Sequence, residues 1–477
     1  MAQILDTIIK ILKEIKVCDH CLGRQFAMLG TGLDNGSRGL FLRTSALIEA
    51  HVLLKECKNL EEDQNVLDAK NLLLFRASIG DSHAIQLLEK LNIDFPDIES
   101  TRSSFDNNEI FEYPECSICK GLFTKVTLDA FIKEAKAVTR ELQFETFLVG
   151  SRCNPLLLDY EAEIRMEYSL KWGETMKSHM NRAIGRLLFE NQDKSVDFKS
   201  PDIVLIYNIT SRSEYKIELV INPYFIYGRY RKLIRGIPQT HWPHRDCHGR
   251  GCEACNFTGK QYMESVEELI QEPVLKITEG TGMKFHGAGR EDIDARMLGE
   301  GRPFTIEILN GKMRNIDYQK LQNAINEFAN GKVEVLGLRE SSKEEMQELK
   351  ESSPNTRKKY RAKCQLEYPA STEDLNLIQE KLEGSIIDQK TPNRVLHRRA
   401  DKIRKKKVYS LKWEYVKDEK NELLEDQIYL FIEAEGGTYI KELISSDGGR
   451  TVPSVTGIAG QQITCKELDV MAVSKKN

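Results

Sequence analysis

The sequence predicts a multidomain α+β protein in which a zinc-containing α/β region precedes a domain built on a mixed, largely antiparallel sheet. Its 477 residues, at about 150 residues per domain, suggest roughly three folded units. Helix-periodic apolar stretches dominate the first half, and short strand-like runs between turns dominate the second. We expect an accessory region at 1–145, an α/β domain at 146–240, a zinc-knuckle linker at 241–270 and the strand-rich domain at 271–477.

Composition is typical of a soluble globular protein. Hydrophobic residues make up 40% of the chain and charged residues 30%, and no apolar run approaches the ~20 residues of a membrane helix. Met1 to Lys16 predicts an amphipathic helix without the apolar block or cleavage site of a secretory signal. We therefore expect a cytoplasmic protein without membrane contact. The net charge of −4 means that any nucleic-acid contact depends on local basic clusters.

Two CxxC pairs form the first candidate metal centre. Its ligands are Cys18, Cys21, Cys116 and Cys119. Four thiolates suit tetrahedral zinc, and each pair is followed by a glycine, Gly23 or Gly121. Nearly a hundred residues separate the two pairs, so a redox function of one CxxC pair is the alternative interpretation.

One short loop supplies the second candidate metal centre. Its ligands are His244, Cys247, Cys252 and Cys255. Gly249 and Gly251 permit the tight turn that a closed zinc knuckle requires. His248 or His241 could replace His244 as the fourth ligand. We expect about two structural zinc ions in all.

The expected elements follow from apolar periodicity. Helices are predicted within residues 36–95 and at Thr175 to Glu190, a loop at Asp97 to Asn108, and adjacent strands at Ile203 to Ile209 and Lys216 to Ile221. Later strands are predicted at Pro303 to Leu309, Lys332 to Leu338, Lys359 to Tyr368, Lys407 to Val416 and Gln427 to Glu433. Helices between them are predicted at Ile316 to Phe328, Ser371 to Leu382 and Thr438 to Ser445. The Lys- and Glu-rich segment from Ser341 to Lys359 predicts a surface hairpin.

Two basic segments are candidates for RNA contact. Between Arg394 and Lys407, eight basic residues face the single acid Asp401. In the segment from Tyr227 to Lys232, which we place at the end of the α/β domain, aromatic and basic residues alternate. Such patterns can stack on bases and hold phosphates, although solvated charge and an exposed strand end are the alternatives.

A Gly-, Asp- and Arg-rich segment from 284 to 304 predicts a site built around a carboxylate. Glycines allow close backbone approach. Arg290 and Arg296 beside Asp292 and Asp294 would hold such a carboxylate ionised. A surface turn rich in ion pairs is the alternative.

Three separated motifs resemble those of pseudouridine synthases. Gly289-Arg290-Glu291-Asp292 resembles the Gly/His-Arg-x-Asp signature, 358–362 resembles the Lys-x-Tyr-x-Ala strand, and 437–443 resembles the Gly-Thr-Tyr-Ile-Arg-x-Leu helix, in the family's order. Segments 389–399 and 296–304 narrow the resemblance to the Pus-ten branch, which in archaea modifies transfer RNA. The Pro201-Asp202 strand start and the 227–239 segment resemble its THUMP-containing half.

The resemblance implies conversion of uridine to pseudouridine in the tRNA T-loop, at conventional positions 54 and 55. It implies structural zinc, no catalytic cofactor, the tRNA T-arm as partner and no obligate protein partner. Asp292 would be the nucleophile or electrostatic partner, with Asp294 as competitor. Tyr360 would stack on the uracil. Lys441 would lower the pKa of the carboxylate and position it, although most relatives have arginine there, which clamps a carboxylate at two points.

The expected substrate-binding residues complete the site. They are Arg290, Arg296, Arg394, His397, Arg398, Arg399, Tyr227, Arg229, Arg231 and Tyr439. A zinc-stabilised RNA-binding protein without catalysis is the main alternative function. A THUMP-linked methyltransferase or thiolation enzyme is a weaker one, because no dinucleotide-style helix adjoins the glycines between Gly280 and Gly289.

Overall fold

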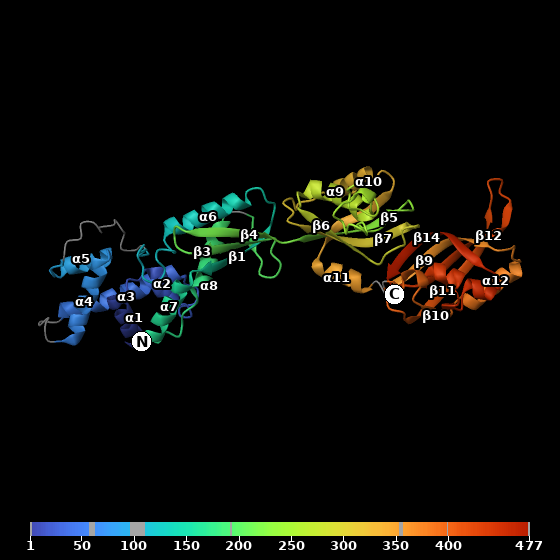
Figure 1. The fold of residues 1–477 in the computed structure, drawn as a ribbon. Coiled ribbons are helices and arrows are strands. Elements are labelled where there is room, and N and C mark those ends of the chain that lie inside the picture. Colours follow the sequence, from blue (N-terminus) through green and yellow to red (C-terminus); the bar gives the residue numbers. More distant parts are fainter. Residues whose placement is uncertain are drawn as a thin grey trace. The chain divides into compact units, whose positions relative to one another are not determined.

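The computed structural model describes residues 2–56, 63–95, 110–190, 193–352, 356–397 and 399–475. The chain forms two compact units, Met1–Asn222 and Pro223–Asn477 (Figure 1). The finer division at residues 145 and 270 remains a prediction. The loop expected at Asp97 to Asn108, and Arg398, lie outside the described residues.

The first unit combines helices with a small sheet. Its helices are α1 (Ala2–Glu14), α2 (Asp19–Gln25), α3 (Asn35–Glu56), α4 (Gln64–Ser78), α5 (Ser82–Lys90), α6 (Lys125–Thr139), α7 (Pro155–Glu167) and α8 (Met176–Leu188). Its strands are β1 (Thr146–Cys153), β2 (Ser195–Val196), β3 (Ile203–Ile209) and β4 (Tyr215–Ile221). The predicted N-terminal helix is confirmed, and its apolar side buries Ile8, Ile11 and Leu12.

The sheet of the first unit has the order β2-β1-β3-β4. β1 pairs in parallel with β2 and β3, whereas β3 and β4 are antiparallel, which confirms the predicted strand pair. The predicted helix α8 begins after Thr175, whose side chain accepts a hydrogen bond from Ser178 N, and it packs on β1. This is the expected α/β arrangement.

The second unit holds the larger sheet. Its strands are β5 (Tyr224–Lys232), β6 (Gly282–Gly287), β7 (Ala295–Leu309), β8 (Val333–Ser341), β9 (Thr356–Leu366), β10 (Ile386–Lys390), β11 (Ile403–Lys417), β12 (Leu423–Glu435), β13 (Thr451–Val452) and β14 (Ile463–Lys475). Its helices are α9 (Val266–Thr278), α10 (Tyr318–Ala329), α11 (Lys343–Ser352), α12 (Thr372–Leu382), α13 (Ile440–Ser445) and α14 (Val455–Ala459).

This ten-stranded sheet is antiparallel except where β7 and β14 run in parallel. Its order is β13-β10-β11-β12-β9-β14-β7-β5-β8, with β6 also paired to β7 (Figure 1). The largely antiparallel prediction is therefore confirmed, as are the five predicted strands and three predicted helices. The segment from Tyr227 to Lys232 lies in β5 and pairs with β7 and β8, so it belongs to this unit and not to the α/β domain.

One predicted element is wrong. The segment expected to form a surface hairpin contains helix α11, which contacts β5, β6 and β7. Met346 and Leu349 are buried against these strands, because their three-residue spacing places them on one helical face. Among the described residues, no helix has the length and apolarity needed to cross a membrane.

Candidate active site and metal centres

The predicted carboxylate site lies on a loop, residues 288–294, that joins β6 to β7. Ala288 N donates to Pro303 O at 2.9 Å, which continues the strand pairing into the loop. Gly289 then adopts a φ of +80°, a conformation that favours glycine, and its carbonyl accepts from Gln239 Nε2 at 3.0 Å. A Cβ on Gly287 would lie 2.8 Å from the same amide nitrogen, so the close approach of Gln239 requires glycine there.

Two cations meet the Asp292 carboxylate. Arg394 contacts both oxygens, with Nη1 3.2 Å from Oδ1 and Nη2 3.1 Å from Oδ2. Lys441 Nζ lies 3.7 Å from Asp292 Oδ2 and 2.5 Å from Asp294 Oδ2. Burial alone would raise the pKa of Asp294, but the hydrogen bond from Lys441 and its charge lower it. Lys441 therefore serves both acids and is closer to Asp294 than to its predicted partner.

Arg394 lies in the segment after β10, and two residues at the start of α13, Tyr439 and Glu442, hold it in place. Arg394 Nε donates to Glu442 Oε1 at 2.7 Å, and its guanidinium lies 5.8 Å from the ring centroid of Tyr439. Burial would lower the pKa of Arg394, but Glu442 and Asp292 together raise it. Arg399 Nη1 donates to Tyr439 Oη at 2.7 Å. The structure thus brings Arg394, Arg399 and Tyr439 together beside Asp292.

Tyr360 lies on β9 with only 8% of its surface exposed. Burial raises the pKa of its phenol to about 12; the nearby charge of Asp292 also raises it, whereas that of Arg302 opposes the shift. Tyr360 therefore stays a neutral, protonated phenol over the physiological range.

A buried network supports the carboxylate loop from behind. Glu291, next to Asp292, accepts from Tyr230 Oη at 2.9 Å and from Arg302 Nε at 2.8 Å, and both ends of the Glu291–Arg302 pair are almost fully buried. Gln239 Nε2 donates to Tyr230 Oη at 2.7 Å. Because each buried polar group has a partner, the network resists rearrangement.

Lys232 fixes the backbone of the same loop. Its fully buried Nζ donates to the carbonyl oxygens of Asp292 at 3.1 Å, Ile293 at 3.1 Å and Ile237 at 2.9 Å. Burial lowers the pKa of Lys232 to about 8, although the nearby acids Glu291 and Asp294 oppose the shift. These hydrogen bonds set the direction in which the Asp292 side chain leaves the loop.

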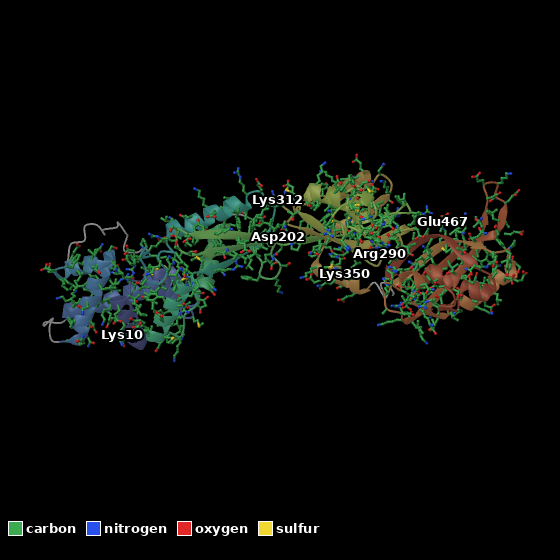
Figure 2. All side chains as sticks on the ribbon, viewed as in Figure 1. Lys10, Asp202, Arg290, Lys312, Lys350 and Glu467 are labelled. Atoms are coloured by element: carbon green, nitrogen blue, oxygen red, sulfur yellow. The ribbon has the colours of Figure 1, made fainter. Side chains whose placement is uncertain are left out.

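Of the two arginines predicted beside the carboxylate, Arg296 binds a different acid. The Arg290 guanidinium, on the loop labelled in Figure 2, lies 4.8 Å from the ring centroid of Trp242. Arg296 binds Asp469, with Nε 2.9 Å from Oδ1 and Nη2 2.9 Å from Oδ2. Arg394 and Lys441 lie at Asp292, so the predicted role of Arg296 at that carboxylate is corrected, while that of Arg290 remains a prediction.

The candidates on β5 point elsewhere. Arg229 donates to the carbonyls of Glu300 and Gly301, and Arg231 Nη1 contacts Glu334 Oε2 at 2.9 Å. Alternation along the strand places Tyr227 with these arginines, on the side opposite Lys232. His397 is exposed on the loop that carries Arg394. The RNA-binding role of these residues remains a prediction.

Sequence reasoning missed several residues of the site. Glu291 and Arg302 both lie inside the motifs quoted above. The charge of Glu291, between Arg290 and Asp292, was the signal that could have identified it as a residue of the site. No sequence pattern indicated that Lys232 is buried and donates to backbone carbonyls. It ends a run of basic residues, and such a run suggests side chains exposed to solvent.

The first metal centre unites the two distant CxxC pairs. Asp19 N donates to Phe111 O at 3.0 Å, Phe111 N donates to Asp19 Oδ2 at 2.7 Å, and Ser117 N donates to Lys16 O at 2.7 Å. These bonds align the two segments. The ligand atoms of Cys18, Cys21, Cys116 and Cys119 consequently lie within 4.8 Å of one another, and all four residues are buried.

The spacing of these sulfurs fits a metal ion. A tetrahedral zinc ion with bonds of about 2.3 Å holds sulfur atoms about 3.8 Å apart. The Sγ atoms of Cys18 and Cys119 are 3.8 Å apart. Arg24, fully buried, donates to Cys21 Sγ at 3.4 Å and so offsets the negative charge of a thiolate cluster.

The second metal centre contains His244, Cys247, Cys252 and Cys255, as predicted. Its Sγ–Sγ distances of 3.7 and 4.0 Å and its His Nδ1–Sγ distances of 3.6 and 3.7 Å also suit a tetrahedral ion. The backbone N–H groups of Gly251 and Gly259 point at sulfurs at 3.3 Å. His244 is the histidine of the group; His241 Nδ1 instead lies 3.4 Å from Glu268 Oε1.

Comparison with known proteins follows the same division of the chain. The family model described as "Pus10, C-terminal" matches residues 225–474, and the one described as "Pus10 THUMP domain, archaeal" matches residues 131–208. A chain in the structure titled "Crystal Structure of a Cbf5-Nop10-Gar1 Complex" is 17% identical, with a TM-score of 0.26 over 44% of this chain and 46% of that one, which is too weak a likeness to support a conclusion.

Relatives match nearly the full length. The tRNA pseudouridine synthase Pus10 of Methanocaldococcus jannaschii is 40% identical over 98% of this chain and 94% of that protein. The Methanopyrus kandleri protein of the same name is 36% identical over 98% of both. These matches confirm the resemblance inferred from the motifs, and the chain belongs to the Pus10 family of tRNA pseudouridine synthases, with that family's archaeal THUMP domain.

Proposed function

We propose that this chain converts uridine to pseudouridine in the T-loop of tRNA, at conventional positions 54 and 55, and that Asp292 acts at the ribose. The observation that carries the proposal is the setting of Asp292. Its side chain is 35% exposed and is paired with Arg394 at 3.1 Å and with Lys441 at 3.7 Å. The charge of Asp292 also raises the pKa of the buried Tyr360 phenol.

The reaction requires one ionised acid and no electron transfer. The bond from C1′ to N1 of the uracil breaks, the base turns, and C1′ bonds to C5; C5 loses a proton and N1 gains one, so substrate and product are isomers. Positive charge develops at C1′ when the base leaves. Asp292 either stabilises that charge or bonds to C1′ until the base has turned. Arg394 and Lys441 contact the carboxylate and orient it.

Tyr360 binds the uracil base, and the basic segment from Arg394 to Lys407 binds the RNA backbone. The reacting atoms are enclosed within a folded T-loop, so the nucleotide has to be everted at a cost of a few kcal/mol. The ring of Tyr360 is the surface on which the everted uracil stacks. Basic residues between Arg394 and Lys407 offset the cost of eversion through phosphate contacts. The THUMP domain is the second supplier of RNA contacts.

We assign zinc to both metal centres, in a structural role. Both offer four ligands with no open position, the arrangement of structural rather than catalytic zinc. The reaction itself draws on the chain's own side chains and needs no catalytic cofactor. A tRNA substrate agrees with a cytoplasmic location.

A pair of matched substitutions tests the assignment. Asp292→Asn keeps the shape of the side chain and removes its charge, whereas Asp294→Asn makes the same change two residues away. Each variant is incubated with unmodified tRNA transcripts, and pseudouridine is mapped by position. We expect Asp292→Asn to form none while it binds tRNA normally, and Asp294→Asn to retain most activity.

The opposite pattern, an active Asp292→Asn and an inactive Asp294→Asn, would transfer the role to Asp294. If the wild-type protein binds tRNA and leaves no pseudouridine in any transcript, the chain functions as a zinc-stabilised RNA-binding protein. Pseudouridine outside positions 54 and 55 would overturn the T-loop assignment alone.

A further inference from the structure

Three arginines converge on one buried carboxylate beside the active site. The Asp469 side chain is 4% exposed. It accepts from Arg296 through two nitrogens at 2.9 Å, from Arg361 Nη2 at 2.9 Å and from Arg235 Nη2 at 2.7 Å. Burial would raise the pKa of Asp469, but the arginines lower it, so the carboxylate is ionised. We call these four residues the Asp469 cluster.

Strand register builds the Asp469 cluster. Asp469 on β14 lies opposite Arg361 on β9 and opposite Arg296 on β7, so the three side chains form one row across neighbouring strands. The adjacent row is Tyr360, Val470 and Met297, which is buried. Because side chains alternate, the Asp469 row lies on the opposite face of the sheet.

The cluster carries more positive charge than its acid neutralises. Three guanidinium groups surround Asp469, and among the residues that the structure describes only Arg235 also forms an ion pair with a second acid, Glu467, at 3.0 Å. Arg296 and Arg361 are 31% and 35% exposed. Within the described ranges, neither Nη1 of Arg296 nor Nη1 of Arg361 has a hydrogen-bond acceptor in the protein.

Asp469 thus orients two arginines whose free N–H groups face solvent. One acid that accepts from both fixes their side chains before any ligand arrives, which reduces the entropy lost on binding. The free groups are planar, charged donors of the kind that bind phosphate oxygens. Lys359 and Lys363 lie on the same face of β9 as Arg361, and their charges balance those of the nearby Glu433 and Glu467, so the excess positive charge of this face comes from the arginines.

Arg235 joins the Asp469 cluster to the catalytic loop. Its Nη1 donates to the carbonyl oxygen of Asp294 at 2.9 Å, while its Nη2 binds Asp469. Arg296 is only two residues beyond Asp294, at most about 7 Å along the chain. The Asp469 cluster is therefore tied to the loop that carries Asp292 both through Arg235 and along the chain.

We propose that Arg296 and Arg361, oriented by Asp469, bind a backbone phosphate of the tRNA substrate close to the everted nucleotide. The inference rests on the proposed function for its ligand and adds a defined phosphate site on a sheet face that the catalytic residues do not use. Phosphate contacts position an RNA without reading its sequence. The site therefore contributes affinity and register.

Arginine-to-glutamine substitutions test the two ligands separately. The full-length variants Arg296→Gln and Arg361→Gln bind an unmodified tRNA transcript at several salt concentrations, and the control Lys284→Gln removes a cation that is paired with Glu307 at 2.8 Å. We expect each arginine variant to lose roughly tenfold in affinity and to lower the slope of log K against log salt by about one. Wild-type slopes in both variants, or an equal loss in Lys284→Gln, would overturn the site.

Asp469→Asn separates orientation from bulk charge. It adds one positive charge, so a site that acts by charge alone would bind tRNA more tightly. We expect weaker binding, because the arginines lose the acceptor that holds them; tighter binding contradicts the proposal. Melting temperatures identify any variant that fails to fold, in which case the arginine variants decide. Since binding is measured apart from catalysis, a wild-type protein that binds tRNA without forming pseudouridine would refute the proposed function and leave this site testable.

Discussion

Arg394 and Asp292 form a two-point ion pair across 102 residues of sequence, with Nη1–Oδ1 at 3.2 Å and Nη2–Oδ2 at 3.1 Å. The sequence motif offered Lys441 as the cation, and a lysine provides a point charge without a fixed plane. In the structure Arg394 provides the planar contact, and Lys441 lies between the two acids. Arg394, on another loop, thus supplies the fixed orientation of the Asp292 carboxylate that a lysine at position 441 cannot supply.

Arg394→Lys tests whether the two-point contact with Asp292 is needed for catalysis. The variant keeps the charge but loses the two-point contact with Asp292 and the bond to Glu442. We expect kcat to fall roughly a hundredfold, since a misplacement of about 1 Å at a reacting group has effects of that size. Single-turnover pseudouridine formation measures it. Arg399→Lys, which changes a contact to Tyr439 only, should raise KM and spare kcat; equal kcat losses in both variants would contradict the specific role of Arg394.

Lys232→Met should weaken catalysis although Lys232 itself does not contact the substrate. The fully buried amine holds the carbonyls of Asp292 and Ile293, and its removal frees the loop that aims the carboxylate. We expect kcat to drop about tenfold or more with KM for tRNA nearly unchanged. Lys332→Met, which removes a half-exposed partner of Glu264, is the control and should have wild-type kcat. A change confined to KM would show that Lys232 does not position Asp292.

Lys358 should make stability depend on pH. Burial, and then the charge of Arg302, lowers its pKa to about 7, against an ordinary value near 10.4. Between these values the unfolded chain binds a proton that the folded protein does not, so this group makes stability rise with pH. At or below pH 7 the folded protein carries the full penalty of a buried charge.

Lys358→Met removes that penalty. Relative to wild type, the variant should gain on the order of a few kcal/mol in free energy of unfolding at pH 7, and the gain should vanish toward pH 10. Urea denaturation at both pH values measures it. Lys359→Met, an exposed neighbour on the same strand, should give a difference independent of pH. A constant difference for Lys358→Met as well would mean that its pKa is not lowered.

Metal content should follow the two ligand sets independently. Elemental analysis of the purified protein is expected to find about two zinc ions per chain, and Cys116→Ser or Cys252→Ser should each lower the content by one. Chelation should reduce the melting temperature, because structural zinc stabilises the folded state. Retention of both ions in either serine variant would exclude that cysteine as a ligand.

Local sequence patterns determined most of the secondary structure. Alternating burial along β9, where Tyr360 and Ala362 are buried and Arg361 is half-exposed, follows the period of a strand whose two faces meet different surroundings. Helix α11 escaped prediction because only Met346 and Leu349 supply its buried face amid charged residues. Two apolar positions are too few to show a helical period in a sequence.

The sequence by itself also determined the motifs, the second metal-ligand set and the family, since each depends on residues that lie close together along the chain or recur in a characteristic order. The fold decided that the two distant CxxC pairs meet in the first set. Tertiary structure alone decided which cation meets which acid: Arg394 with Asp292, Lys441 closest to Asp294, and Arg296 with Asp469. Sheet register and loop packing bring these partners together across 102 to 173 residues. A chain with 69 basic and 73 acidic residues offers many pairings of equal chemistry, and only the folded backbone selects among them.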